Sequence, residues 1–247
     1  MVTDRSFPFM VEITIPLGGG VVFCGGSLLS TNYVLTAAHC LIDPNTSRPF
    51  DPETVTLGTG SNNIQQPITS LADTLTLHPQ YDPKASIHDI ALVRLAKPFR
   101  LNLINTRAVT LSDRPISDGL ILLVVGWGRT QFNGTVADGL RQVNVTAGPA
   151  RDCAKSGYGL GDQQGSMFCT ARNENRDACK GDSGGPLLYQ DGGSYQVVGI
   201  SSFRYSLTDR APVCGSKDML TFYTRPSFYL NWIAKVTNIP KTRLLGK

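Results

Sequence analysis

The chain has 247 residues, of which 41% are hydrophobic and 17% are charged. This balance excludes an intrinsically disordered chain, which would be rich in charge and poor in apolar residues. Lys and Arg total 23 against 19 Asp and Glu, and the net charge of +4 includes no dense basic run, so nucleic acid is not an expected partner. No apolar stretch reaches about 18 residues, so no membrane partner is expected either.

Short apolar runs separated by turn residues predict an all-β protein. In chain order, the expected strands cover residues 21–23, 33–36, 54–57, 90–95, 120–125 and 197–200. Turn-forming residues rich in Gly, Asn, Asp and Pro separate them at 18–20, 43–45, 133–134 and 191–193. Strands at this spacing, without helices between them, favour an antiparallel barrel or sandwich.

The last element has a different pattern. Apolar side chains recur at positions 229, 230, 233 and 236, which is helical spacing, and Pro226 precedes a candidate N-cap, Ser227. We therefore expect a C-terminal helix at about 227–237. The polar segment 110–119 is the expected linker between the two halves of the chain.

Three short motifs carry candidate catalytic residues. His39 lies in Leu-Thr-Ala-Ala-His-Cys, Asp89 in His-Asp-Ile-Ala-Leu, and Ser183 in Gly-Asp-Ser-Gly-Gly-Pro. A single histidine is more often structural, and a glycine-rich run is usually only a turn. The three together favour a serine nucleophile, because a serine hydroxyl needs a base, and an imidazole with a pKa of about 6.5 can accept and return its proton.

These motifs, with Ser-Phe-Pro-Phe at 6–9 and Gly-Trp-Gly at 126–128, resemble the chymotrypsin/trypsin family of serine proteases over nearly the whole chain. The resemblance implies a single peptidase domain of two six-stranded antiparallel β-barrels, at about 9–112 and about 118–226. It also implies an active site between the barrels and a C-terminal helix.

The same resemblance assigns roles in a Ser-His-Asp acyl-enzyme mechanism. Ser183 is the expected nucleophile, His39 its base, and Asp89 the partner that orients the imidazole. The backbone N–H groups of Gly181 and Ser183 are the expected oxyanion hole. Ser202, in the strand after the nucleophile, matches the serine that supports the aspartate, and it begins a segment expected to bind substrate.

The cysteines indicate an oxidising compartment. Their even number, six, and the sequons at Asn45, Asn133 and Asn144 favour a secreted glycoprotein. Sequence alone cannot choose among the pairings that six cysteines allow. The family resemblance implies Cys24–Cys40, Cys153–Cys169 and Cys179–Cys214. Because the cysteines are far apart and no acidic calcium loop is visible around 58–66, no metal and no other cofactor are expected.

Specificity is expected to depend on Asp177, six residues before Ser183, where trypsin-like relatives carry the carboxylate at the base of the P1 pocket. The first interpretation is cleavage after Arg or Lys. Phe203 and Arg204 replace a Trp-Gly pair, and Thr221 replaces a second wall glycine, so the pocket should be narrower than in an open trypsin. The Arg204 side chain either points to solvent or lies over the mouth of the pocket, and pairing with Asp177, which would shut the pocket, is the extreme form of the second alternative.

The beginning of the chain departs from the family pattern. Active members begin with a free Ile-Val-Gly-Gly end whose ammonium group pairs with the aspartate before the nucleophile, here Asp182. We expect that end, with a signal and a propeptide, to lie upstream of Met1, because residues 1–10 have neither a basic start nor a long apolar run. The alternative is a protein that dispenses with this switch.

The leading hypothesis is therefore a secreted, monomeric endopeptidase that acts on polypeptides and is a target for protein protease inhibitors. One alternative is a self-inhibited or zymogen-like protease that needs a partner or substrate to open. The other is a non-catalytic protease homologue that acts as a binding module. All three residues His39, Asp89 and Ser183 are present, which argues against the last alternative.

Overall fold

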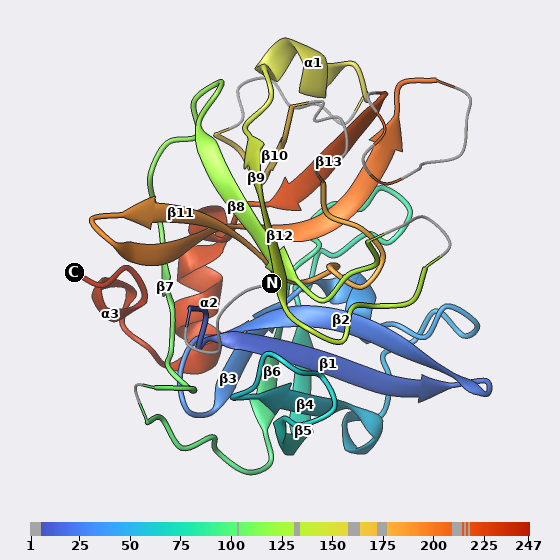
Figure 1. Cartoon of the computed structure of the whole chain (residues 1–247), viewed down its shortest axis with the longest axis vertical. Coiled ribbons are helices and arrows are strands. Elements are labelled where there is room, and N and C mark those ends of the chain that lie inside the picture. Colours follow the sequence, from blue (N-terminus) through green and yellow to red (C-terminus); the bar gives the residue numbers. More distant parts are fainter. Residues whose placement is uncertain are drawn as a thin grey trace.

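The computed structural model describes residues 6–102, 104–130, 134–157, 164–171, 177–208, 214, 216 and 218–247. Its architecture is almost wholly β, with β1 to β6 gathered in the lower half of the view and β8 to β13 in the upper half (Figure 1). The predicted all-β fold class is therefore confirmed. Within the described residues, no helix is both long and apolar enough to cross a lipid bilayer.

The first half of the chain forms a closed six-stranded barrel that begins with a glycine-turned hairpin. Gly18 and Gly19 join the first two strands with φ of 54° and 82°, a region that favours glycine, and this two-residue turn sets the pairing of Leu17 with Gly20. The strands follow the order β1-β2-β3-β6-β5-β4, and β4 pairs back onto β1. Their bounds are β1 Met10–Leu17, β2 Gly20–Leu28, β3 Tyr33–Thr36, β4 Thr56–Thr59, β5 Ile68–Leu77 and β6 Ala91–Leu95.

The second half forms a sheet in the order β10-β13-β12-β11-β8-β9, with β7 pairing in parallel to β12. Its bounds are β7 Thr110–Leu111, β8 Ile121–Gly126, β9 Arg141–Thr146, β10 Met167–Cys169, β11 Pro186–Asp191, β12 Ser194–Ser206 and β13 Met219–Thr224. Its outer strands β9 and β10 are joined only beyond their ends, by an isolated bridge between Ala147 and Thr170. The second barrel thus closes more loosely than the first, and β7 departs from the purely antiparallel expectation.

The predicted C-terminal helix is present, but it begins differently from the expectation. A 3₁₀ turn, η3 (Pro226–Tyr229), precedes the helix α2 (Leu230–Thr237), and Arg225 is the residue before that turn. Ser227 lies inside the turn, and its Oγ has no hydrogen-bond partner among the described residues, so the N-cap prediction is wrong. Two shorter helices, α1 (Ala150–Ala154) and α3 (Lys241–Leu244), were not predicted.

Each of the six predicted strand ranges overlaps a strand of the structure, namely β2, β3, β4, β6, β8 and β12. The range 54–57 begins too early, because residue 54 still belongs to the 3₁₀ turn η2 (Pro52–Thr54). The expected linker 110–119 contains only the short strand β7 and otherwise runs in irregular conformation between the two halves.

A buried tryptophan connects the two halves near the site. Trp127 follows β8, is 1% exposed, and packs in the same core cluster as first-barrel residues such as Ile13 and Leu35. Its indole Nε1 donates to the carbonyl of Asn62 at 2.7 Å, in a loop of the first barrel. The Gly-Trp-Gly motif therefore anchors one half on the other.

Candidate active site

Strand pairing in the first barrel brings His39 and Asp89 together. His39 lies on the 3₁₀ turn η1 (Ala38–Leu41) just after β3, and Asp89 lies just before β6, which pairs with β3. One carboxylate oxygen of Asp89 accepts the His39 backbone N–H at 2.9 Å, and the other lies 2.8 Å from His39 Nδ1. The aspartate thus holds both the backbone and the ring of the histidine, which fixes the ring orientation.

Asp89 is also held by the second sheet. It is 1% exposed, and its side chain accepts a hydrogen bond from the hydroxyl of Ser202 in β12. The Thr224 hydroxyl in β13 donates to the Asp89 backbone carbonyl at 2.9 Å. The sequence analysis missed Thr224, because a threonine in an apolar strand carries no signal of its own. Both halves of the molecule therefore position this carboxylate.

The charges of the pair follow from this geometry. Burial by itself would raise the pKa of Asp89, but the charge of His39 and the hydrogen bonds from His39 and Ser202 lower the pKa overall. Burial alone would lower the pKa of His39, but the charge of Asp89 and its hydrogen bond raise that pKa above 6.5. Asp89 therefore stays anionic at neutral pH and stabilises an imidazolium at His39.

A tight turn holds Ser183 against the segment that leads to His39. The Ser183 carbonyl accepts from the Gly25 N–H at 2.7 Å, and the Gly184 N–H donates to Ser201 at 2.8 Å, so the turn is bonded to both halves. Gly184 has φ of 74°, and a Cβ there would lie 2.2 Å from the Thr36 hydroxyl oxygen. Only glycine allows this close approach, which explains the Ser-Gly-Gly sequence.

The backbone N–H groups of Gly181 and of Ser183 itself have no acceptor among the described residues. The Lys180 carbonyl accepts from the Arg129 N–H at 2.8 Å, and because C=O and N–H of a trans peptide point opposite ways, the Gly181 N–H points away from Arg129. Within the described chain, neither the Gly181 N–H nor the Ser183 N–H donates to a protein group. Gly181 has φ of 99°, a conformation that favours glycine. These donors are available to a negatively charged oxygen.

Asp182 is buried beside a second cavity. Its two carboxylate oxygens accept from the N–H groups of Gly128 and Cys179, each at 2.8 Å. Asp182 borders a cavity of about 290 Å³, which we call the Asp182 cavity and which is lined also by Asp177, Gly126 and Gly128. Burial raises the pKa of Asp182 to about 6, and among the described residues no basic side chain lies within ion-pair distance of it.

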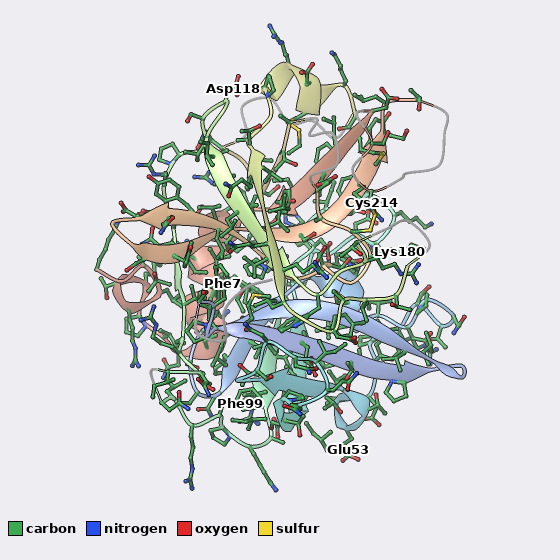
Figure 2. The ribbon with its side chains drawn as sticks, viewed as in Figure 1. Phe7, Glu53, Phe99, Asp118, Lys180 and Cys214 are labelled. Carbon is green, nitrogen blue, oxygen red and sulfur yellow. A yellow bond between two sulfur atoms is a disulfide. The ribbon has the colours of Figure 1, made fainter. Side chains whose placement is uncertain are left out.

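Ser183 faces a cavity of its own. This Ser183 cavity has a volume of about 240 Å³ and is lined by Ser183, Lys180, Phe203, Arg204 and Thr221, together with the residues that adjoin them, including Ser202. The ring of Phe203 is stacked on Phe222 at 4.8 Å, which fixes one wall. Lys180 in this lining follows Cys179, which is bonded to Cys214, and Figure 2 labels Lys180 and Cys214 at the right of the molecule.

Asp177 does not line the Ser183 cavity. The Thr221 hydroxyl donates to one Asp177 carboxylate oxygen at 2.5 Å, and the Ala178 N–H donates to the other at 2.8 Å. Asp177 instead borders the Asp182 cavity, and burial raises its pKa to about 6. Thr221, which lines the Ser183 cavity, therefore lies between that cavity and the carboxylate.

Arg204 neither points to solvent nor pairs with Asp177. Its guanidinium contacts the Cys179–Cys214 disulfide, with Nη1 donating toward Cys214 Sγ and lying 4.0 Å from Cys179 Sγ. The side chain is half-buried at the Ser183 cavity rather than directed to solvent, so the solvent alternative is wrong. Among the described residues, the ion pairs do not include one between Arg204 and Asp177, although the positive charge of Arg204 does lower the pKa of Asp177 somewhat.

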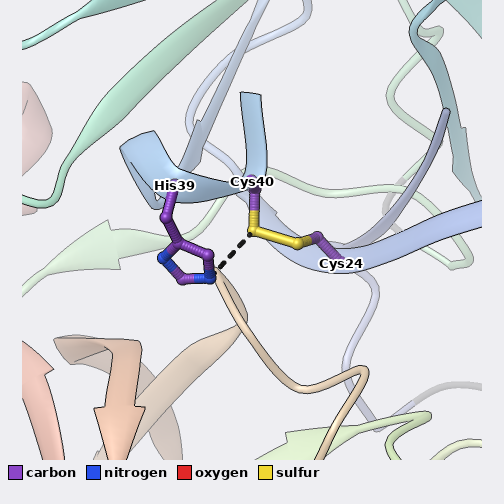
Figure 3. Close-up of side chains that lie close together, drawn as sticks. All are labelled: Cys24, His39 and Cys40. Carbon is purple, nitrogen blue, oxygen red and sulfur yellow. Dashed lines mark hydrogen bonds between the residues drawn. A yellow bond between two sulfur atoms is a disulfide. The ribbon is translucent and has the colours of Figure 1, made fainter. Parts of the chain in front are cut away.

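The structure contains three disulfides, and they join the pairs that the family resemblance implies. They are Cys24–Cys40, Cys153–Cys169 and Cys179–Cys214. The first lies beside the candidate base, with Cys40 Sγ 3.7 Å from His39 Nε2 (Figure 3). Cys24, His39 and Cys40 form a compact cluster of metal-ligand types, but bonded sulfurs provide no thiolate, so this cluster does not fit a metal ion.

The neighbouring His88 is held by aromatic residues next to Asp89. It is half-buried, its Nδ1 lies 2.9 Å from the Tyr229 hydroxyl, and its ring is stacked on His78 at 4.8 Å. Its φ of 55° turns the chain just before Asp89. His88 therefore braces the aspartate segment against the C-terminal helix region.

Comparison with known proteins agrees with this geometry. The family model described as Trypsin matches residues 1–233. The chain belongs to the trypsin family of serine proteases. It is 31% identical over 245 residues to chymotrypsin-like elastase family member 1 of Macaca fascicularis, covering 94% of this chain and 85% of that protein. The counterpart in Homo sapiens is 31% identical over 245 residues (94% and 88%), and trypsin iota of Drosophila melanogaster is 32% identical over 235 residues (95% and 85%).

The structure brings most of the expected site residues of a trypsin-family chain together, but it places Asp177 apart from them. His39, Asp89 and Ser202 are joined by hydrogen bonds, and Ser183 borders the same cavity as Phe203, Arg204 and Thr221. Asp177 lies with Asp182 instead. The three disulfides fit an oxidising compartment. Of the predicted sequons, Asn45 and Asn144 are exposed, and Asn133 lies outside the described residues.

Proposed function

We propose that this chain is a secreted serine endopeptidase that hydrolyses polypeptides through an acyl-enzyme. The observation that carries the proposal is the buried Asp89 carboxylate, which holds the His39 backbone and ring at 2.9 and 2.8 Å. A fixed imidazole with a raised pKa is suited to general-base catalysis. We propose that the enzyme acts as a monomer and that protein protease inhibitors occupy the same site.

In the proposed mechanism, the Ser183 hydroxyl attacks the substrate carbonyl while His39 Nε2 accepts its proton. Asp89 stabilises the resulting imidazolium, which then protonates the leaving amine. The N–H groups of Gly181 and Ser183 stabilise the oxyanion, and losing one such donor typically costs about 3 kcal/mol in the transition state. Water, deprotonated by His39, then releases the acyl group from Ser183.

A fluorophosphonate probe tests the proposal directly. We expect the probe to label Ser183, at a rate that rises with pH as His39 loses its proton, with a midpoint above 6.5 because Asp89 raises that pKa. The rate is read by mass spectrometry of the labelled peptide at a series of pH values. Ser183→Ala is the control and should take up no label. A folded chain without label at any pH would support the binding-module alternative instead.

We also propose that the P1 pocket accepts a short, uncharged side chain. Thr221 closes the Ser183 cavity with a methyl and a hydroxyl that is already donated to Asp177, and Arg204 adds a positive charge at the wall. A cationic P1 side chain would have to displace that hydroxyl and approach Arg204. The similarity to proteins named elastases supports this proposal over the expected cleavage after Arg or Lys.

A P1 peptide library should distinguish these specificities. We expect the wild type to cleave after Ala or Val in preference to Arg or Lys, and Thr221→Gly to raise kcat/KM for Arg substrates about tenfold or more by removing the steric barrier to Asp177. Thr221→Ser is the matched control, because it keeps the hydroxyl that caps Asp177. If the wild type already cleaves mainly after Arg or Lys, the short-pocket proposal is refuted and the Asp177 expectation is restored.

A further inference from the structure

Two segments of the chain carry cations and no acidic residue. Residues 90–112 contain Arg94, Lys97, Arg100 and Arg107, and residues 219–247 contain Arg225, Lys235, Lys241, Arg243 and Lys247, with neither Asp nor Glu in either segment. They meet in the fold, because α2 and α3 lie alongside β7 (Figure 1) and the Tyr33 hydroxyl between them donates to the Val236 carbonyl at 3.3 Å. Of these cations, Arg225 is buried and donates to two backbone carbonyls, and Arg94 and Lys247 are paired with Asp73 and Asp113. Lys235, Lys241 and Arg243 have no ion pair among the described residues.

A groove of about 570 Å³ lies where these segments meet. We call it the C-terminal groove, and its lining includes Leu29, Arg94, Leu101, Val109, Ile239 and Arg243. None of its lining residues lines the Ser183 cavity or the Asp182 cavity. The groove is thus separate from the candidate active site.

The groove combines apolar surface with positive charge. Leu101 in its lining is 38% exposed and Ile239 is half-buried, so the groove presents aliphatic surface to solvent. Arg94 is paired with Asp73, whereas Arg243 has no ion pair among the described residues. No carboxylate is among the residues that line the groove. An anionic group there would meet an uncompensated guanidinium.

We propose that the C-terminal groove binds a polypeptide segment in which acidic and aliphatic side chains alternate. The acidic side chains would pair with Arg243 and extend the Arg94–Asp73 pair, and the aliphatic ones would cover Leu101 and Ile239, which are at least partly exposed. A polysaccharide polyanion would complement only the positive charge of the groove, because it has no aliphatic side chains to pack against the aliphatic lining. The site would capture a substrate or partner protein away from the scissile bond.

The test is peptide binding to the full chain carrying Ser183→Ala, so that the probe is not cleaved. The probe is fluorescein-labelled (Glu-Leu)₅, measured by fluorescence anisotropy at low and high salt. Adding Arg243→Glu should weaken binding about tenfold or more, since a charge-assisted contact is lost and a repulsive one gained. The matched control is Arg151→Glu on the exposed surface of α1, which changes the net charge equally and should leave the affinity unchanged.

Other probes decide between the groove and charge alone. (Gln-Leu)₅ and (Glu)₁₀ should both bind more weakly than (Glu-Leu)₅, and added salt should weaken the binding of (Glu-Leu)₅. The proposal would be overturned if Arg243→Glu and Arg151→Glu lost the same affinity for (Glu-Leu)₅. It would also be overturned if (Glu)₁₀ and (Glu-Leu)₅ bound with equal affinity. A further contrary outcome concerns a heparin oligosaccharide as competitor. If it displaces the (Glu-Leu)₅ probe from the Arg243→Glu variant as well as from the protein with Arg243, the proposal also fails. These outcomes do not depend on catalysis, so they are independent of the proposed protease function.

Discussion

Replacing Ser183 with alanine is expected to lower kcat for amide hydrolysis by about 10⁶-fold, because the nucleophile of the proposed acyl-enzyme is lost. His39→Ala should lose nearly as much, since without the base the hydroxyl of Ser183 is a weak nucleophile at neutral pH. The double variant should lose little more than either single variant. The measurement is single-turnover hydrolysis of a peptide amide by each purified protein.

The controls for this experiment concern the fold. Ser183 is only half-buried and its side chain makes no hydrogen bond among the described residues, so Ser183→Ala should keep the wild-type melting temperature. His39→Ala leaves the buried Asp89 without its ring partner and should melt at a lower temperature. If the rate losses of the two single variants simply multiply in the double variant, the two residues do not share one step and the proposed mechanism fails.

A cationic α-amino group is expected to activate the enzyme by entering the Asp182 cavity. The buried Asp182 carboxylate has a pKa raised to about 6 and no basic partner in the described chain, so an ammonium group there would favour its charged form. Such a buried pair is typically worth about 3–5 kcal/mol when one partner is removed. A chain with a free Ile-Val-Gly-Gly end appended several residues upstream of Met1 should therefore exceed the chain starting at Met1 by about 10²–10³-fold in kcat/KM.

The same extension with its amine acetylated is the matched control, and it should remain as weakly active as the chain starting at Met1. In the free-amine form, activity should also decline above about pH 8, where an α-amino group loses its proton. The acetylated form should show no such decline. Equal activity of free and acetylated forms would show that Asp182 needs no ammonium partner, and would favour a protease that dispenses with this switch.

Local chemistry in the sequence was enough to predict part of the fold. The glycine pairs at 18–19 and 192–193 mark two-residue hairpin turns because their positive φ values favour glycine, and both turns occur in the structure. The predicted ranges cover none of seven described strands, namely β1, β5, β7, β9, β10, β11 and β13. In β5 and β9, the apolar residues are diluted by exposed polar ones at the barrel surface. The 3₁₀ start of the C-terminal helix was missed because Ser227 fits a local capping pattern that the neighbouring chain does not use.

The sequence motifs located the candidate site residues, but they could not predict which cavity Asp177 faces. His39, Asp89 and Ser183 stand in short motifs whose glycines and alanines are required by close backbone contacts, such as that of Gly184 with Thr36. Asp177 also stands in a motif, but the cavity that it faces depends on where Thr221 places its hydroxyl, more than forty positions along the chain. Such a contact exists only in the folded molecule, so position within a motif could not predict it.

Because residues from both halves of the molecule hold Asp89, the proposed catalytic geometry is complete only when folding is complete. His39 holds this carboxylate from one barrel, while Ser202 and Thr224 hold it from the other, so the partner of the imidazole is fully anchored only when both halves are folded. A nascent or partly unfolded chain, whose exposed segments are the easiest to cut, therefore lacks part of the hydrogen bonding that orients the proposed base. In the proposed mechanism, hydrolytic power therefore arises only once the backbone of the chain has become a poor target, which would protect newly made molecules from digesting one another.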